Sequence, residues 1–196
     1  MTWLLRRAGD ADLDAIMAME RSVFTSDAWS DDMMRSELAS PHGYYLVATD
    51  ADGDGTELAG YAGLFAPSKS NDADIQTIAV APSARGRGLG RLLMLSLIER
   101  GRQQGVTQVF LEVRADNPVA GGLYTSLGFE ELGIRPGYYQ PDNVDAVVMR
   151  LTVLPQEPAT TGVEAPGGAA VPGAAAVPGA AAVPGAAAVP GAAAVP

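Results

Sequence analysis

The sequence predicts a mixed α/β domain over residues 1–154, followed by a low-complexity tail over residues 155–196. Strand-like and helix-like stretches alternate in the first part, which is typical of a sheet covered by helices. After Leu154 there is no Lys, Arg or aromatic residue, and from Ala169 the chain repeats Ala-Ala-Val-Pro-Gly-Ala. Pro interrupts helices and Gly adds chain entropy, so we expect the tail to be disordered; a docking or self-associating segment is the alternative.

The first half of the domain is predicted to combine antiparallel strands with two helices. A strand over residues 3–7 precedes a helix that Asp10 can cap and whose apolar residues, up to Phe24, recur at helical spacing. Ser30, followed by two acids, begins a second helix that ends near Pro41. A turn rich in Gly and Asp then joins two strands into a hairpin, residues 44–49 and 58–65.

The second half is predicted to follow a β-α-β-α order, with a last strand after it. With the antiparallel first half, this order indicates a mixed α/β fold. The short helix that comes next begins at Asn117-Pro118, a favourable N-cap and first-turn pair. In order, the segments are a strand over 75–80, a helix over 89–103, a strand over 106–113, a helix over 118–127 and a strand over 144–151.

Composition excludes several functional classes. With 13 Lys and Arg against 23 Asp and Glu, the chain has a formal net charge of −10, which argues against nucleic-acid binding. There is no Cys and only one His, His42, so we expect no disulfide, no thiol nucleophile and no metal site. The N-terminus has no apolar leader, and no apolar run approaches the roughly 20 residues that span a bilayer. We therefore expect a cytoplasmic protein that binds no membrane.

A glycine-rich loop lies between the 75–80 strand and the 89–103 helix. Gly86, Gly88 and Gly90 alternate with other residues, and three Arg surround them. Glycines let the backbone approach a ligand, and a helix N-terminus favours an anion, so this loop can hold a phosphate or pyrophosphate. It matches neither the P-loop nor the dinucleotide fingerprint. A plain strand-to-helix turn is the alternative interpretation.

Several motifs together resemble the Gcn5-related N-acetyltransferases (GNAT). Arg85-x-x-Gly88-x-Gly90 after a strand is similar to the family's coenzyme A pyrophosphate loop. Leu-Glu-Val-Arg-Ala-Asp-Asn at residues 111–117 and Leu-Tyr-Thr-Ser-Leu-Gly-Phe at residues 123–129 resemble its RimI type, the ribosomal-protein-alanine N-acetyltransferases. The likeness covers residues 1–151, with two departures, Pro118 and the repeat tail. It implies the GNAT fold, a mixed sheet of about seven strands flanked by about four helices.

The resemblance assigns two catalytic residues. Glu112 would be the general base, and Tyr124 the general acid that protonates the coenzyme A thiolate. In a strand, side chains alternate between faces, so Glu112 and Arg114 share one face. Two structural alternatives stay open: Glu112 as a solvent-facing partner of Arg114 or another neighbour, and Tyr124 as a core aromatic.

Acetyl-CoA is the implied cosubstrate, and the resemblance places its contacts. The backbone of residues 78–80 would hold the pantetheine arm, and residues 86–91 the pyrophosphate. Asn117 would contact the cofactor as well as cap its helix. The expected contacts are Ile78, Ala79, Val80, Arg85, Gly86, Arg87, Gly88, Leu89, Gly90, Arg91 and Asn117.

The acceptor side is less fully marked. By resemblance, Trp29 and a loop containing Tyr138 and Tyr139 would frame an acceptor peptide, although Trp29 is equally well explained as a core residue. The acids at positions 27, 31, 32, 142 and 145 could attract an Arg-rich N-terminus or could form a solvated face. The implied function is acetyl transfer to the N-terminal alanine of a small-subunit ribosomal protein by a monomer. A lysine or broad N-terminal acetyltransferase and a non-catalytic acyl-CoA sensor are the rivals.

Overall fold

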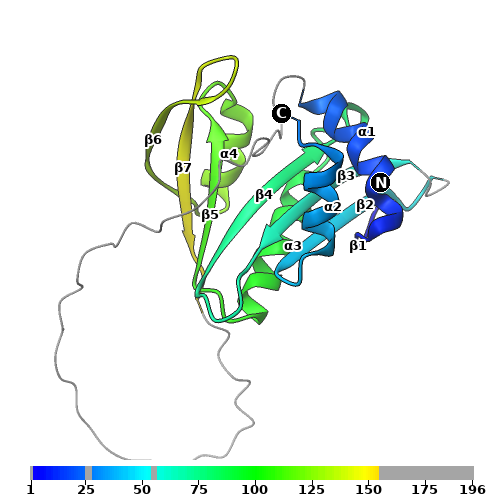
Figure 1. Cartoon of the computed structure of the whole chain (residues 1–196), viewed down its shortest axis with the longest axis horizontal. Coiled ribbons are helices and arrows are strands. Elements are labelled where there is room, and N and C mark those ends of the chain that lie inside the picture. Colours follow the sequence, from blue (N-terminus) through cyan, green and yellow to red (C-terminus); the bar gives the residue numbers. More distant parts are fainter. Residues whose placement is uncertain (1, 25–27, 54–56, 155–196) are drawn as a thin grey trace, which may run out of the picture.

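A computed structural model describes residues 2–24, 28–53 and 57–154 of the chain. In this part a seven-stranded sheet has the order β1-β2-β3-β4-β5-β7-β6 (Figure 1). Only β4 and β5 run parallel; all other neighbours are antiparallel. The strands are β1 Trp3–Arg7, β2 Gly43–Asp50, β3 Leu58–Phe65, β4 Asp72–Val80, β5 Gln108–Arg114, β6 Glu130–Tyr139 and β7 Val144–Thr152.

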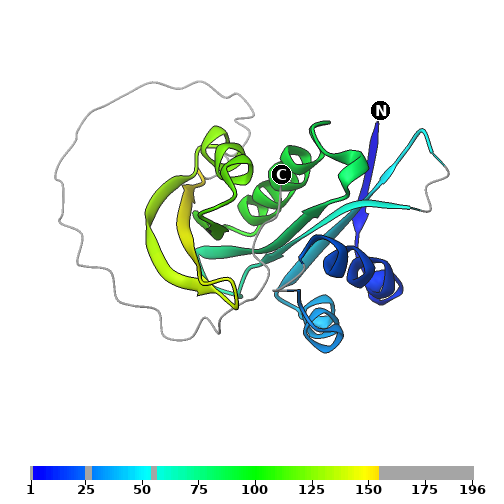
Figure 2. The same ribbon diagram turned by 90° about the horizontal axis from the view of Figure 1, so that it is seen from above.

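Four α-helices cover the two faces of this sheet, which confirms the predicted mixed α/β class. They are α1 Leu13–Val23, α2 Asp31–Ala39, α3 Leu89–Gln103 and α4 Pro118–Ser126, with short 3-10 helices at Asp10–Asp12 and Pro82–Ala84. Figure 2 shows α1 and α2 on one face and α3 and α4 on the other. The larger core lies under α3 and α4 and includes Leu93 and Leu111, while a second core lies under α1 and α2 and includes Ile16 and Tyr61.

The two N-terminal helices begin differently from each other. Ser30 caps α2 as predicted, because its hydroxyl accepts a hydrogen bond from the Met33 N–H at 3.2 Å. The prediction that Asp10 caps α1 is wrong. Asp10 starts the 3-10 turn, and it is Asp12 that accepts the Gly9 N–H, at 2.9 Å. The α-helix therefore starts only at Leu13.

Strand β6 is absent from the sequence-based list of elements, and the expected loop at Tyr138 and Tyr139 is wrong, since both residues end this strand. Its Pro136 and Gly137 are typical of loops. A strand can carry them here because β6 lies at the edge of the sheet and pairs only with β7. Between Arg135 and Tyr139 the register shifts, so the Pro-Gly pair falls in an irregular stretch.

The domain core extends to the C-terminal end of the described residues. Val153 is buried, and its N–H donates to the Thr107 carbonyl at 2.8 Å. Part of the predicted hairpin turn (residues 54–56) and the tail lie outside the described residues. Among the described helices, none is long and apolar enough to cross a membrane.

The feature that positions the site is the separation of β4 from β5. Among the described residues, the two strands pair at only three positions, from Asp72 opposite Gln108 to Asp74 opposite Phe110. Beyond them the strands diverge (Figure 1). An extra residue in β4, Gln76, breaks the register with β3 just after this point, and such a bulge bends a strand. We call residues 75–80 of β4 and 111–114 of β5 the β4–β5 fork.

Candidate active site

The loop before α3 has the backbone that an anion site needs. Gly86 and Gly88 have φ angles of +69° and +81°, in the left-handed region that glycine adopts most readily. A Cβ added to either would meet nothing within 4 Å, so backbone conformation and not crowding requires glycine here. Gly88 is the N-cap of the 15-residue α3, whose first turn carries no acid. The first N–H groups of this helix and its dipole therefore face outward without a competing carboxylate.

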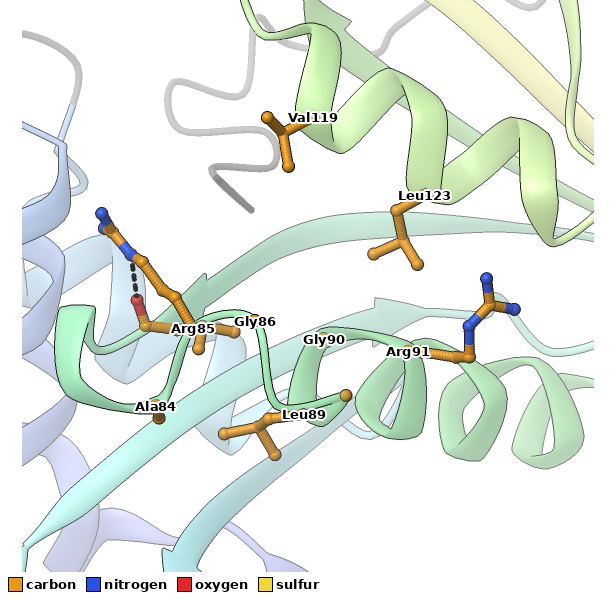
Figure 3. A pocket seen from close by; sticks show the side chains of 10 residues that line it. Ala84, Arg85, Gly86, Leu89, Gly90, Arg91, Val119 and Leu123 are labelled. Carbon is orange, nitrogen blue, oxygen red and sulfur yellow. Dashed lines mark hydrogen bonds between the residues drawn. The ribbon is translucent and has the colours of Figure 1, made fainter.

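A cavity of about 270 Å³ lies between this loop and α4 (Figure 3). Most of the predicted phosphate loop lines it. Val119 and Leu123, four residues apart on α4, lie on the opposite side of the opening, and the sequence analysis did not assign them to the site. Both are apolar and four residues apart on one helix, and this spacing is the sequence signal that could have found them. The lining residues are Val80, Ala84, Arg85, Gly86, Gly88, Leu89, Gly90, Arg91, Val119 and Leu123.

Four predicted cofactor contacts do not line this cavity. Ile78 and Ala79 are fully buried, and their side chains belong to the cores on opposite faces of the sheet. The Asn117 side chain accepts the Ala120 N–H at 3.0 Å, which confirms its capping role. Arg87 lines a separate cavity with Trp3, whose indole N–H donates to the Arg87 carbonyl at 3.3 Å.

Two arginines of the cavity are held by hydrogen bonds. The Nε of Arg85 donates to the Val80 carbonyl at 3.2 Å, as drawn in Figure 3. The guanidinium of Arg91 donates to the Ser126 hydroxyl at the end of α4. These bonds fix two positive charges beside the helix N-terminus, which adds to the favourable field for an anion.

Glu112 lies in the fork on the sheet face that carries α1 and α2. Leu111 and Val113, its neighbours, are buried in the core on the other face. The Glu112 side chain is 23% exposed, and it pairs with Arg135 of β6, with Oε1 to Nη1 at 3.0 Å. Arg114 pairs instead with Asp116. The sequence analysis left open whether Glu112 pairs with Arg114 or with another neighbour, and the structure shows that its partner is Arg135.

A second carboxylate, Asp74, lies beside Glu112, and the sequence analysis missed it. The residue is exposed, and partial loss of hydration raises the pKa of Asp74 to about 6. The charges of Glu112 and Asp72 act in the same direction, and Arg135 opposes them. The predicted strand began at Ile75, one residue too late to include Asp74.

Tyr124 is fully buried in the core on the other face of the sheet, 5.9 Å from Phe129 between ring centroids. Its hydroxyl has no hydrogen-bond partner among the described residues. Burial raises the pKa of Tyr124 well above its usual range, and Tyr139 adds to the shift. A buried hydroxyl without a partner costs about 1–3 kcal/mol, and a hydrogen bond to a ligand would remove that cost. The side chain is thus both a core aromatic and an available donor.

The predicted acceptor residues are mostly buried. Trp29 is 4% exposed in the core under α1 and α2, and its backbone N–H donates to Glu20 at 3.0 Å. Tyr139 is 2% exposed. Tyr138 lies closer to the fork, because the Arg135 guanidinium is 5.6 Å from its ring centroid.

Four of the five acids suggested to attract a basic peptide form ion pairs or hydrogen bonds within the protein. The fifth, at position 27, lies outside the described residues. Asp32 pairs with Arg35 at 2.8 Å and Asp142 with Arg114 at 3.2 Å. Asp31 pairs with Arg21, and Asp145 accepts the Gly137 N–H. In the described part of the chain, no group of three His, Cys, Asp or Glu residues could hold a metal ion.

Comparisons with known proteins give a consistent result. The family description "Acetyltransferase (GNAT) family" matches residues 13–129. The N-alpha-acetyltransferase RimI of Mycobacterium tuberculosis is 38% identical over 143 residues, which cover 71% of this chain and 86% of that protein. An uncharacterized protein of Mycobacterium leprae, ML0378, is also 38% identical over 143 residues, but the match spans only 38% of its length.

A solved structure extends the likeness to the whole described fold. The ribosomal-protein-S18-alanine N-acetyltransferase of Escherichia coli matches with a TM-score of 0.69 and 29% identity. The match covers 83% of this chain and all of that one. Sequence, fold and the loop before α3 agree, and the chain belongs to the acetyltransferase (GNAT) family.

Proposed function

We propose that this protein transfers an acetyl group from acetyl-CoA to the N-terminal α-amine of a protein. The proposed acceptor is the N-terminal alanine of a small-subunit ribosomal protein. One observation carries the proposal: Glu112 lies on one face of the fork, and the unpartnered hydroxyl of Tyr124 lies in the core on the other. The name of the M. tuberculosis relative supports transfer to an N-terminal α-amine, and the name of the E. coli structure supports an alanine of a ribosomal protein as the acceptor. We further propose that residues 1–154 carry the activity as a cytoplasmic monomer.

The residues of the cavity and the fork fit acetyl-CoA, which supplies the acetyl thioester when bound. Gly86 to Arg91 would hold the pyrophosphate with backbone N–H groups and the charge of the helix N-terminus. The β4 backbone over residues 78–80 would hold the pantetheine arm. That backbone is available because β5 does not pair with it.

Glu112 would take the proton that the acceptor amine loses on attack. An α-amine near pKa 8 is about 2.4 units easier to deprotonate than a Lys side chain, or roughly 3.3 kcal/mol. A carboxylate is a weak base, so it suits the terminal amine better. Because Arg135 pairs with Glu112, the incoming amine must compete for the carboxylate.

Tyr124 would donate a hydrogen bond to the departing thiolate. Its raised pKa keeps the phenol protonated, as a donor requires. Full proton transfer would be uphill, since a thiol near pKa 8.5 is the stronger acid. The hydroxyl therefore stabilises the leaving group mainly as a fixed donor. The chain has no Cys to carry an acetyl group, so we propose direct transfer between the bound substrates.

The first prediction concerns the loop before α3. Gly88→Asp should weaken acetyl-CoA binding at least tenfold, because it places a carboxylate at the helix N-terminus and strains a residue at φ +81°. Gly105→Asp is the matched control, since Gly105 has φ +85° and equal space beyond the other end of α3. Calorimetry should find its affinity unchanged. Equal acetyl-CoA affinity in folded Gly88→Asp would remove the loop from the site.

The second prediction tests the proposed acceptor. Mass spectrometry of peptides incubated with acetyl-CoA should find an Ala-initiated peptide acetylated on its terminal amine. A peptide with a blocked N-terminus and an internal Lys should react far more slowly, given the gap of about 2.4 units in amine pKa. A preference for Lys would favour the lysine acetyltransferase. Acetyl-CoA binding without acetylation of any peptide would favour the sensor.

The third prediction separates the two catalytic roles. Glu112→Gln and Tyr124→Phe should each lower kcat by roughly 10²–10⁴-fold with little change in acetyl-CoA affinity. The Gln variant should recover at high pH, where the terminal amine is already neutral. The Phe variant should show the same pH dependence as the wild type below about pH 10, because burial keeps Tyr124 protonated there. Steady-state rates from pH 6 to 10 check this, and an unchanged kcat in either variant would contradict its role.

A further inference from the structure

We propose that Arg135 is a positioning residue that occupies the Glu112 carboxylate until an acceptor amine displaces it, and so keeps this base from activating water against acetyl-CoA. The inference rests on the proposed function, in which Glu112 is the base. It draws on three features: the strand register that brings the two side chains together, the different partners of the neighbouring Arg114, and the exposure of the ion pair.

Arg135 reaches Glu112 across an intervening strand. Glu112 of β5 is opposite Val148 of β7, and Val148 is opposite Gly133 of β6. Arg135 is two residues beyond Gly133 in the same register, so its side chain lies on the same face of the sheet as Glu112. Two strand spacings separate β5 from β6, about 10 Å, which only a long side chain can span. The Nη1 atom of Arg135 lies 3.0 Å from Oε1 of Glu112.

A second arginine on this face, Arg114, is closer to Glu112 along the chain but is held elsewhere. It is two residues from Glu112 on β5. Its side chain is 20% exposed and pairs with Asp116 at 3.0 Å and with Asp142 at 3.2 Å. Among the residues that the structure describes, Arg135 forms an ion pair only with Glu112, and its side chain is 47% exposed. Arg135 is therefore the cation that can leave.

The displaced guanidinium has other favourable contacts close by. It already lies 5.6 Å from the centroid of the Tyr138 ring, within the range of a cation–π interaction. It is also near enough to Asp74 to oppose the rise in the pKa of that carboxyl group. An exposed ion pair contributes little, so an acceptor amine can replace Arg135 at Glu112 with a loss of up to about fivefold in affinity.

A free carboxylate beside a bound thioester would also serve a side reaction. The Glu112 side chain is 23% exposed, so water can reach it when no acceptor is bound. As a base, Glu112 would take a proton from that water while the water oxygen bonds to the acetyl carbonyl carbon and the carbon–sulfur bond breaks. The products are acetic acid and the coenzyme A thiolate, which takes up the proton from Glu112. Arg135 slows this hydrolysis because it occupies the carboxylate.

The test measures the release of coenzyme A from acetyl-CoA with no peptide present, by reaction of the freed thiol with a chromogenic disulfide. The protein has no Cys, so it adds no thiol signal of its own. Arg135→Gln should hydrolyse acetyl-CoA about two- to fivefold faster than the wild type, in line with the strength of an exposed ion pair. Arg135→Lys keeps the charge and should stay near the wild-type rate. The double variant Glu112→Gln/Arg135→Gln should lose the increase, because no base remains.

A binding measurement checks the same competition without turnover. Calorimetry with coenzyme A present should find that Arg135→Gln binds an Ala-initiated octapeptide about two- to fivefold more tightly than the wild type does. The same peptide acetylated at its N-terminus offers no amine to Glu112, so both proteins should bind it equally. Arg35→Gln, which breaks an exposed ion pair with Asp32 on α2, is the matched control and should behave as the wild type in both assays.

The outcomes separate this inference from the proposed function. If Arg135→Gln lacks either change while it and the wild type still acetylate the peptide, the inference is overturned. Faster hydrolysis that persists in the double variant would also overturn it, because Glu112 would then not be the base that Arg135 restrains. If the wild type acetylates no peptide, or if Glu112→Gln acetylates it at the wild-type rate, the proposed function itself fails.

Discussion

The site depends on one constraint: β4 and β5 are paired at only three positions and then separate. If the parallel pairing continued, the backbone N–H and C=O groups of β4 and β5 would bond to each other, and none on the facing sides would remain for a ligand. The bulge at Gln76 bends β4 just where pairing ends. Because β3 and β7 hold the outer sides of the two strands, the fork stays open without losing its shape.

The opening also separates the two proposed catalytic groups. Glu112 lies with Asp74 and Arg135 on one face of the sheet. A substrate amine that reaches this face would compete with Arg135 for the Glu112 carboxylate. Tyr124 lies in the core on the other face, where burial keeps its phenol protonated. The glycine-rich loop follows directly from the end of β4, so the fork and the anion site share Val80. One irregular strand therefore links cofactor binding to the reacting groups.

Much of this arrangement could be predicted from local sequence, and the rest depends on contacts between distant residues. Helix α3 and the cap at Ser30 follow from short-range periodicity and hydrogen bonding, and both are confirmed. Strand β6 was missed because Pro136 and Gly137 are tolerated only at a sheet edge, which sequence does not reveal. The Arg135 partner of Glu112 comes from that strand, so it was missed for the same reason. Asp74 was missed because it comes close to Glu112 only through the register between β4 and β5, which local sequence does not reveal.

Amide hydrogen exchange with and without acetyl-CoA tests the central claim most directly. The account predicts that binding slows exchange at least about tenfold in two places: residues 88–91, and those amides of residues 76–80 that β3 does not already hold. Amides of β1 and β2, far from the fork in the sheet order, should exchange as before. Slowed exchange at the loop with none along residues 76–80 would contradict the claim that the open side of β4 holds the cofactor.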